Sequence, residues 1–596
     1  MKKYLFFAIA LLGMASCAKD DLGNGNKPNH NGEVEESYIA INLMAADSGT
    51  RGTSGTSNDD YEEGTDAERA VKTAHFFFFD EDGEPFTVNN SDAAASAPVG
   101  EKNHLALSIS ENDNPASKLP NVSDIKKAVL ILETYKGVYP SQIVAVINWV
   151  PTENTYTLAA LHSELVALNG TNGFVMSNSV YMDGANKMVD AVPLTADNIK
   201  TSADDAKAKP VDIYVERIAA KVVLTANGKV NGTTNIFDTQ KDSSPLDKNS
   251  ATTSPIDVYV QLLGWELYND YNTSNLLKNI NTDWGIGTDL GLTWNDPNRY
   301  RSYWAISQAT TLTDKFAWNY TSNIQTANGF KTEYGFAVAD TANYTDANTF
   351  TYCGENTGVS TVSTIDSKTV VTPYDKNTKV ILKGQLMKKN GENYEELELA
   401  RWYGTEYAGE EALRIAVANS LKYTLFYSSG GTNFDSIEPE DLICVAGNKV
   451  DAKAYEVGFQ LSTAADHGTN KTWYKYDSVN GYVKLGNPDN YDDNVAKTNE
   501  YLKTVQPALL YKSGQTYYIV DIEHFGTKTA AYGVVRNHVY QIDINSIKGY
   551  GSPIFDGYSD VITPEYPDDE DNSSYVAARI NVLSWKVVKQ SVDIVQ

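Results

Sequence analysis

The sequence predicts a mainly β protein with a few short helices, organised in more than one domain. Apolar side chains alternate at period two along many segments, and turn-forming residues separate these segments. The chain holds 38 tyrosines against 18 phenylalanines, and tyrosine is well suited to half-exposed strand faces. With 596 residues, of which 41% are hydrophobic, the chain is long enough for two or three domains with real cores.

The chain begins with the features of a lipoprotein signal. Two lysines precede a short apolar run within residues 1–16, and this run is too short to span a membrane as a helix. Small residues directly before Cys17 resemble a bacterial lipobox, which implies cleavage before Cys17 and lipidation of that cysteine. Residues 17–36, rich in Gly, Asn and Glu, then form a lipidated tether. The alternative is a plain secretory signal followed by a chance cysteine.

The first strand expected after the tether covers residues 37–44. Its apolar face consists of Ile39, Ile41 and Leu43. The loop that follows, residues 45–66, contains almost no side chain that could pack. Arg51 lies in this loop among Gly, Ser and Thr residues, where a trypsin-like protease could cut, and Arg69 is a second candidate close to the next strand. Many exposed loops contain an arginine, so the position alone does not establish processing.

Further strands and one helix are expected before a polar stretch that predicts a domain boundary. The strands cover residues 71–79, 128–134, 142–149, 174–180 and 210–225. Apolar residues at helical spacing predict a helix over 158–168, which ends before an Asn-Gly pair. The polar stretch at 227–254 marks the boundary. The N-terminal domain is therefore expected to span residues 37–226, including the first strand and the cleavage loop.

A second β region begins after this boundary. Strands are expected at residues 256–269, 379–387, 517–523 and 537–547, and an amphipathic helix begins at residue 411. The C-terminal domain is expected to span residues 227–574. No repeat at a fixed period is visible in the sequence, so a solenoid or propeller is not predicted.

The last segment, residues 575–596, has the pattern of a long strand. Ile580 and Val582 lie on one apolar face, and Trp585 and Val587 continue that face after a one-residue slip in the alternation. Such a slip needs a bulge or bend, and no return turn is evident. An acidic, turn-rich spacer precedes the segment, so the strand could pair with its own sheet or with that of a neighbour. Taken alone, closing its own sandwich is the commoner arrangement.

Charge and motifs exclude several functions. The formal net charge of −28 argues against nucleic acid and anionic membrane surfaces as direct partners. The sequence has no zinc, nucleophile-elbow, dinucleotide or phosphate-loop motif, and its seven histidines lack metal spacing. We therefore predict no enzymatic activity, no metal and no cofactor. Cys353 and Cys444 could form a disulfide, but nothing in their spacing fixes the geometry.

Several segments together resemble the fimbrial subunits of Bacteroidales, the major and minor fimbrillins of Porphyromonas type. The resemblance begins with the lipobox at Cys17, the first strand and the Arg51 loop. The further segments that carry it, in chain order, are VKTAHFFFFDEDGE, QIVAVINW, FVMSN, VERIAAKVVL, YYIVDIEH, VVRNHVYQIDINSIKGYGSP and INVLSWKVVKQSVDI. The likeness is closer to the shaft subunit of the minor fimbrium. Residues 250–500 match poorly and are expected to carry insertions.

The resemblance implies two transthyretin-like β-sandwich domains and a C-terminal donor-type strand. The precursor would be exported to the cell outer membrane as a lipoprotein, and a trypsin-like protease would cut after Arg51 and remove the first strand. The groove left behind would receive the C-terminal polymerisation strand of another subunit, which gives a head-to-tail homopolymer in a surface fimbrium for adhesion or biofilm formation. The side chains exchanged would be Ile39, Ile41 and Leu43 for Ile580, Val582, Trp585 and Val587.

Two other functions are weighed against this one. A surface glycan-binding lipoprotein would use exposed aromatic side chains such as Trp284, Trp294 and Trp304. An exported glycosidase is less favoured, because nearly every acidic run lies in a turn or linker. A shaft subunit needs a cleavable first strand and a free C-terminal strand, whereas a glycan binder needs neither.

Overall fold

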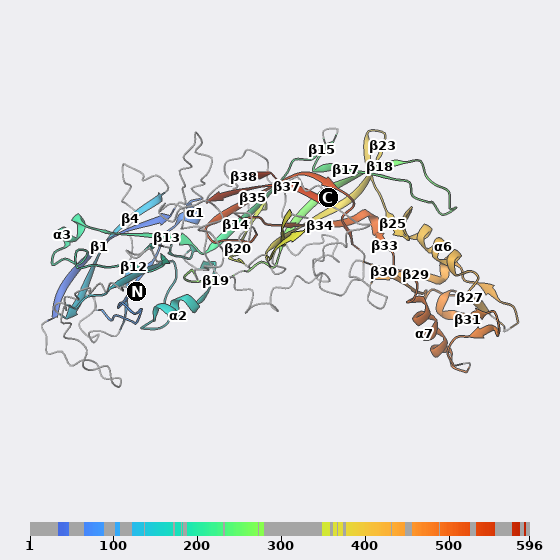
Figure 1. The fold of residues 1–596 in the computed structure, drawn as a ribbon, viewed down its shortest axis with the longest axis horizontal. Coiled ribbons are helices and arrows are strands. Elements are labelled where there is room, and N and C mark those ends of the chain that lie inside the picture. The colour runs from blue at the N-terminus through green and yellow to red at the C-terminus, as the bar shows by residue number, and fades with distance from the viewer. Residues whose placement is uncertain are drawn as a thin grey trace, which may run out of the picture.

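The structure is a computed structural model, mainly β with a few short helices (Figure 1). It describes residues 34–46, 65–88, 102–107, 122–135, 138–170, 173–179, 181–182, 188–230, 233–271, 273–278, 348–357, 361–365, 368–372, 377–428, 430, 432–446, 456–487, 489–524, 532–554, 575–584 and 589–591. Three large apolar clusters organise these residues. We call them the N-terminal core (buried residues from Ile39 to Leu277), the central core (Ala220 to Tyr550) and the inserted core (Ala400 to Leu510).

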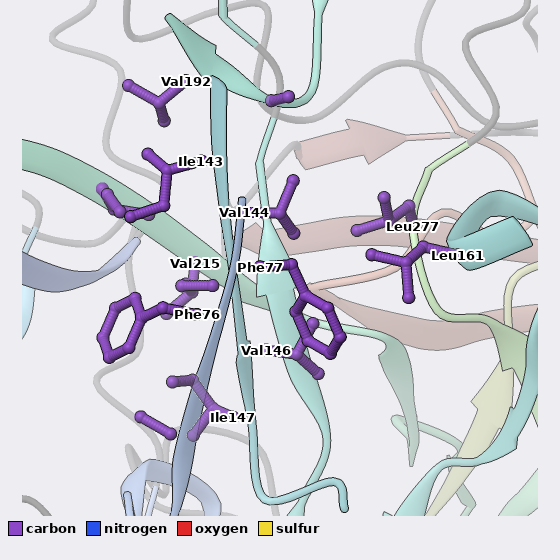
Figure 2. Packing of buried hydrophobic residues seen from close by; sticks show 14 of the residues in the cluster. Phe76, Phe77, Ile143, Val144, Val146, Ile147, Leu161, Val192, Val215 and Leu277 are labelled. Atoms are coloured by element: carbon purple, nitrogen blue, oxygen red, sulfur yellow. The ribbon is translucent and has the colours of Figure 1, made fainter. Parts of the chain in front are cut away.

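The N-terminal core is built on an eight-stranded sheet in the order β3-β2-β5-β9-β13-β1-β4, with β12 added beside β5. The strands are β1 (Val34–Ala46), β2 (Ala74–Phe79), β3 (His104–Leu107), β4 (Val122–Tyr135), β5 (Gln142–Ile147), β9 (Met176–Asn178), β12 (Val192–Pro193) and β13 (Val211–Arg217). All six residues of β2, AHFFFF, are buried. Figure 2 shows Phe76 and Phe77 pointing to opposite faces of this strand, so both faces of the sheet are covered.

The helix expected over residues 158–168 is shorter in the structure. Helix α2 (Leu158–Ser163) begins at its cap Thr157, whose side chain accepts a hydrogen bond from Ala160 N at 3.0 Å. The chain then forms β6 (Leu165–Ala167), which pairs with β19 (Thr273–Asn275). This correction has a tertiary cause, because pairing with a strand more than a hundred residues away overrides the local helical spacing.

The strand expected over residues 210–225 is two strands in different sheets. β13 ends at Arg217, and β14 (Ala219–Ala226) joins a five-stranded sheet in the order β20-β14-β35-β37-β38. Ile218 N donates to Val175 O in the first core, whereas Ala219 O accepts from Asn537 N next to the second. The chain therefore changes sheets at Ile218, ahead of the domain boundary expected at residues 226 and 227. The continuous apolar run over these residues gives no indication in the sequence that the chain changes sheets.

The central core lies between this five-stranded sheet and a six-stranded one. The five-stranded sheet also contains β20 (Phe350–Gly354), β35 (His538–Lys548), β37 (Tyr575–Ser584) and β38 (Lys589–Ser591). The six strands opposite are β17 (Ile236–Ser243), β18 (Ile256–Tyr268), β23 (Lys379–Asn390), β24 (Asn393–Glu396), β34 (Gln515–Asp521) and β36 (Ser552–Pro553). Trp265 and Tyr540, one from each sheet, are fully buried between them.

A third core interrupts the second domain, which was expected to be a single sandwich over residues 227–574. Its entry strand β25 (Leu399–Trp402) pairs with its exit strand β33 (Leu509–Tyr511). Between them lie β26 (Thr405–Tyr407), α6 (Gly409–Leu421), β27 (Leu425–Ser428), β28 (Asp435–Ser436), β29 (Leu442–Ala446), β30 (Val457–Leu461), β31 (Thr472–Asp477), β32 (Gly481–Lys484) and α7 (Tyr491–Leu502). In Figure 1 this orange part forms the end of the molecule opposite the blue strands. Most of it lies within residues 250–500, the range expected to carry insertions.

Short elements complete the described chain. They are α1 (Asp66–Arg69), α3 (Ala203–Ala208), β7 (Asn169–Gly170), β8 (Gly173–Phe174), β10 (Tyr181–Met182), β11 (Met188–Val189), β15 (Lys229–Val230), β16 (Thr233–Thr234), β21 (Thr361–Ile365), β22 (Lys368–Thr372), η5 (Pro439–Asp441), η6 (Gly468–Asn470) and η7 (Lys512–Gly514).

The two cysteines of the described chain do not form the disulfide left open by their spacing. Cys353 and Cys444 are free and buried, and they belong to the central and inserted cores respectively. Burial raises the pKa of both thiols and keeps them protonated.

Candidate strand-exchange site

Strand β1 is an interior strand of the N-terminal sheet. It runs parallel to β13, where Ile41–Ala45 pair with Val211–Val215. On its other side it runs antiparallel to β4 along its whole length, from Val34 opposite Tyr135 to Ala46 opposite Val122. Because β4 has no other neighbour in the described sheet, β1 is the link between β4 and the remaining strands.

Two of the expected apolar residues of β1 lie inside the N-terminal core. Ile39 is 0% exposed and Ile41 is 1% exposed. The backbone of Leu43 pairs with Ile213 on one side and with Lys126 on the other. Tyr38 N donates to Lys200 O at 2.6 Å, and Lys200 N donates to Tyr38 O at 3.0 Å. Strand β1 is thus fixed by two ladders, one further bridge and its buried isoleucines.

The C-terminal strand lies on the body of its own chain. β37 runs antiparallel to β35, with Ile580 opposite Ile542 and Val582 opposite Tyr540. β38 then pairs antiparallel with β37, so the chain reverses between Ser584 and Lys589. This corrects the expected absence of a return turn. Between β35 and β37, the register shift lies on β35, between Ile544 and Ser546.

The structure does not bring the two candidate strands together within one chain. β1 belongs to the sheet of the N-terminal core, whereas β37 belongs to a sheet of the central core (Figure 1). Other predicted positions lie outside the described residues, namely Cys17, Arg51, Trp585, Val587, Trp284, Trp294 and Trp304. The described chain resumes at Thr65, near the end of the predicted cleavage loop.

A residue that the sequence analysis missed lies just after that loop. Glu68 in α1 is 1% exposed and forms a capping box with Thr65, with Thr65 N donating to Glu68 Oε2 at 2.5 Å and Glu68 N donating to Thr65 Oγ1 at 3.3 Å. Burial opposes the charge on Glu68, but Lys221 Nζ at 3.1 Å, together with hydrogen bonds, outweighs this and lowers the pKa of Glu68. The Thr-x-x-Glu spacing was the available signal.

One group of side chains among the described residues has the spacing of a cation site. Glu438, Asp441 and His467 place their ligand atoms within 4.8 Å of one another. Lys471 Nζ lies 2.7 Å from Asp441 Oδ1 and 3.1 Å from Glu438 Oε2. Because the ammonium group already pairs with both carboxylates, we interpret the cluster as an ion-pair network of the inserted core. Within the described part of the chain, no helix has the length and apolar character to cross a membrane.

A family model matches the C-terminal part of the chain. Residues 509–591 match the model described as major fimbrial subunit protein type IV, fimbrillin, C-terminal. The matched range contains β35 and β37, so it includes both the C-terminal strand and the strand on which it lies. No curated protein matches this chain.

Solved structures of fimbrial proteins align with the chain at low identity. A fimbrillin from Porphyromonas gingivalis covers 93% of this chain and 98% of its own, with 12% identity and a TM-score of 0.32. A C-terminally truncated tip fimbrial protein from the same species covers 91% and 99%, with 12% identity and a TM-score of 0.25. A fimbrial assembly protein from Parabacteroides distasonis covers 60% and 100%, with 10% identity and a TM-score of 0.24. Because these TM-scores are low, we draw no functional inference from the alignments.

Proposed function

Because its C-terminal part matches the fimbrillin family, a family of structural fimbrial subunits rather than enzymes, we propose that this chain is a shaft subunit of a cell-surface fimbria. The precursor is exported as a lipoprotein anchored through Cys17. A trypsin-like protease cuts after Arg51 and removes β1, and the C-terminal strand of the next subunit takes its place. The product is a head-to-tail homopolymer that supports adhesion or biofilm formation.

The interior place of β1 is the observation that carries this proposal. Removing β1 would leave a slot bordered by β13 on one side and β4 on the other, each with an unpaired edge. Apolar residues such as Leu130, opposite Ile39, line this region of the sheet. An open slot with two strand edges and an apolar floor is the receptor that strand addition requires.

The C-terminal strand has the dimensions of a donor. β37 contains 10 residues and β1 contains 13, so their lengths are similar. On its own body, β37 has β35 along one edge. Among the described residues, its other edge pairs with β38 only at Arg579–Asn581. In the slot, both edges of β37 would meet long strands, which increases the number of main-chain hydrogen bonds. Moving β37 into the slot also breaks its hydrogen bonds with β35, and this loss opposes the exchange.

Side-chain burial adds to the exchange. Removal of β1 takes Ile39 and Ile41 out of the N-terminal core. Each fully buried isoleucine contributes about 1.5–3 kcal/mol, so an empty slot is strongly disfavoured in water. A donor strand that buries apolar side chains of similar size in the slot forms a stable contact between subunits. Because the slot and the donor lie on different parts of the subunit, the contact is heterologous and leads to a filament rather than a closed dimer.

Electron microscopy of the purified precursor tests this function. Wild-type protein treated with limited trypsin should form filaments or ladders, whereas untreated protein should not. Arg51→Ala should remain monomeric after trypsin, and a chain truncated after Ser574 should be cut but not polymerise. If trypsin-treated wild type never assembles, or if both variants assemble as wild type does, the strand-exchange function is wrong.

A further inference from the structure

The chain just after the predicted cleavage loop is tied to the junction of two cores. The carboxylate of Glu68 accepts hydrogen bonds from Thr65 N, from Lys221 Nζ at 3.1 Å and from the hydroxyl of Tyr352. Lys221 lies on β14 and Tyr352 on β20, both in the sheet of the central core. Since Lys221 and Glu68 are each 1% exposed, the pair is shielded from water and ions.

The main chain of α1 is held at the same junction. Arg217 Nε donates to the carbonyl oxygen of Glu68 at 2.7 Å, and its Nη1 donates to Asn537 Oδ1 at 3.1 Å. Arg217 ends β13 in the N-terminal core, while Asn537 directly precedes β35 in the central core. One buried guanidinium therefore joins α1 to both cores.

A second side chain holds the residues that lead into β2. Asn148 Oδ1 accepts from Lys72 N at 2.9 Å, and Asn148 Nδ2 donates to Ala70 O at 2.7 Å and to Phe174 O at 2.9 Å. Asn148 has a φ of 59°, in the left-handed region that asparagine tolerates better than most residues. Residues 65–73, which we call the retention clamp, are thus bound independently of β1.

We propose that the retention clamp determines where processing stops. A protease must draw several residues into an extended conformation, so a cut inside the clamp requires the buried contacts of Glu68 to open first. A cut after Arg51 removes β1 without disturbing them, whereas a cut after Arg69 is blocked. The clamp also keeps the new N-terminal segment docked at the junction once β1 has left. This inference rests on the proposed function in one respect, namely that the protease cuts the chain at a position before Thr65.

Proteolysis with mapping of the cut positions tests the clamp. Purified precursor is treated with an arginine-specific protease, and new N-termini are followed by mass spectrometry over time. Wild type should be cut after Arg51 and stay intact at Arg69. Glu68→Ala should accelerate the cut after Arg69 by about 10- to 100-fold, because Lys221 then loses its buried carboxylate and local opening becomes easier.

Two threonine variants distinguish an effect of the retention clamp on cutting from an effect of general destabilisation of the fold. Thr65→Ala removes one cap of the clamp and should accelerate the Arg69 cut about fivefold. Thr157→Ala makes the same change at the cap of α2, away from the clamp, and should leave that cut unchanged. Thr65→Ala decides the question if Glu68→Ala does not fold.

The possible cutting patterns test the retention clamp and the proposed processing site separately. Equal cutting after Arg51 and Arg69 in wild type would overturn the clamp, as would unchanged Arg69 cutting in a folded Glu68→Ala or Thr65→Ala variant. Resistance at both arginines would instead contradict the proposed processing site, while faster Arg69 cutting in the variants would still support the clamp. The two failures are therefore distinguishable.

Discussion

Replacement of Ile39 should destabilise the precursor but not the processed subunit. Ile39 is 0% exposed and lies on β1, so Ile39→Ala should lower the free energy of unfolding of the precursor by about 2–5 kcal/mol. After processing, the residue has left with β1, and the same substitution should have no effect. Ile213→Ala is the matched control, because Ile213 is also 0% exposed but lies on β13 and stays in the subunit.

Urea unfolding of chains truncated after Ser574 measures this difference without polymerisation. The four proteins are Ile39→Ala and Ile213→Ala, each before and after limited trypsin, and each is compared with wild type in the same state. Ile39→Ala should shift the midpoint only before trypsin, and Ile213→Ala should shift it in both states. If Ile39→Ala destabilises the trypsin-treated chain as much as the precursor, β1 has not been removed, and the reasoning is refuted.

Two further predictions concern buried charge. Burial, with a smaller contribution from the neighbouring His104, lowers the pKa of His75 from 6.5 to about 4, so the unfolded chain binds the proton more readily. The contribution of His75 to the free energy of unfolding is complete above about pH 6.5 and falls by about 1–3 kcal/mol as the pH drops toward 4. Urea midpoints measured across this pH range should decrease accordingly, and His75→Gln should make the decrease smaller. Glu355→Ala should destabilise the fold by about 3–5 kcal/mol, because it leaves Arg536, 0% exposed and 2.9 Å away, without its carboxylate. Lys497→Ala removes an exposed ion pair and should leave the urea midpoint almost unchanged; equal effects of the two substitutions would contradict this account.

Strands with clear local patterns could be predicted from the sequence. Residues 71–79, 142–149 and 537–547 all contain strands of the structure, since their alternation or continuous apolar runs have few other solutions. The burial of Ile39 and Ile41 follows from the same period-two pattern. Local patterns therefore located the strands but not their sheets.

The features that were missed depend on contacts between distant residues. The change of sheet at Ile218 occurs within an unbroken apolar run. Only the hydrogen bonds of Ile218 with Val175 and of Ala219 with Asn537 reveal it. The inserted core closes through β25 and β33, whose pairing joins residues more than a hundred positions apart. Glu68 directly follows an acidic loop, where a carboxylate is usually solvated, and its charge is compensated by Lys221 on the distant strand β14. Sequence spacing alone does not specify such long-range partners.

Binding of an isolated C-terminal strand tests the central claim most directly. A fluorescent peptide of residues 575–596 is added to the chain truncated after Ser574, before and after limited trypsin, and anisotropy is measured against a scrambled peptide. Truncation also uncovers the edge of β35 on which β37 lies, so the peptide can bind there in either state. The account predicts additional binding only after trypsin, and no such gain for trypsin-treated Arg51→Ala. Equal binding before and after processing, or no binding to the processed chain, would contradict the claim that removal of β1 opens a slot for this strand.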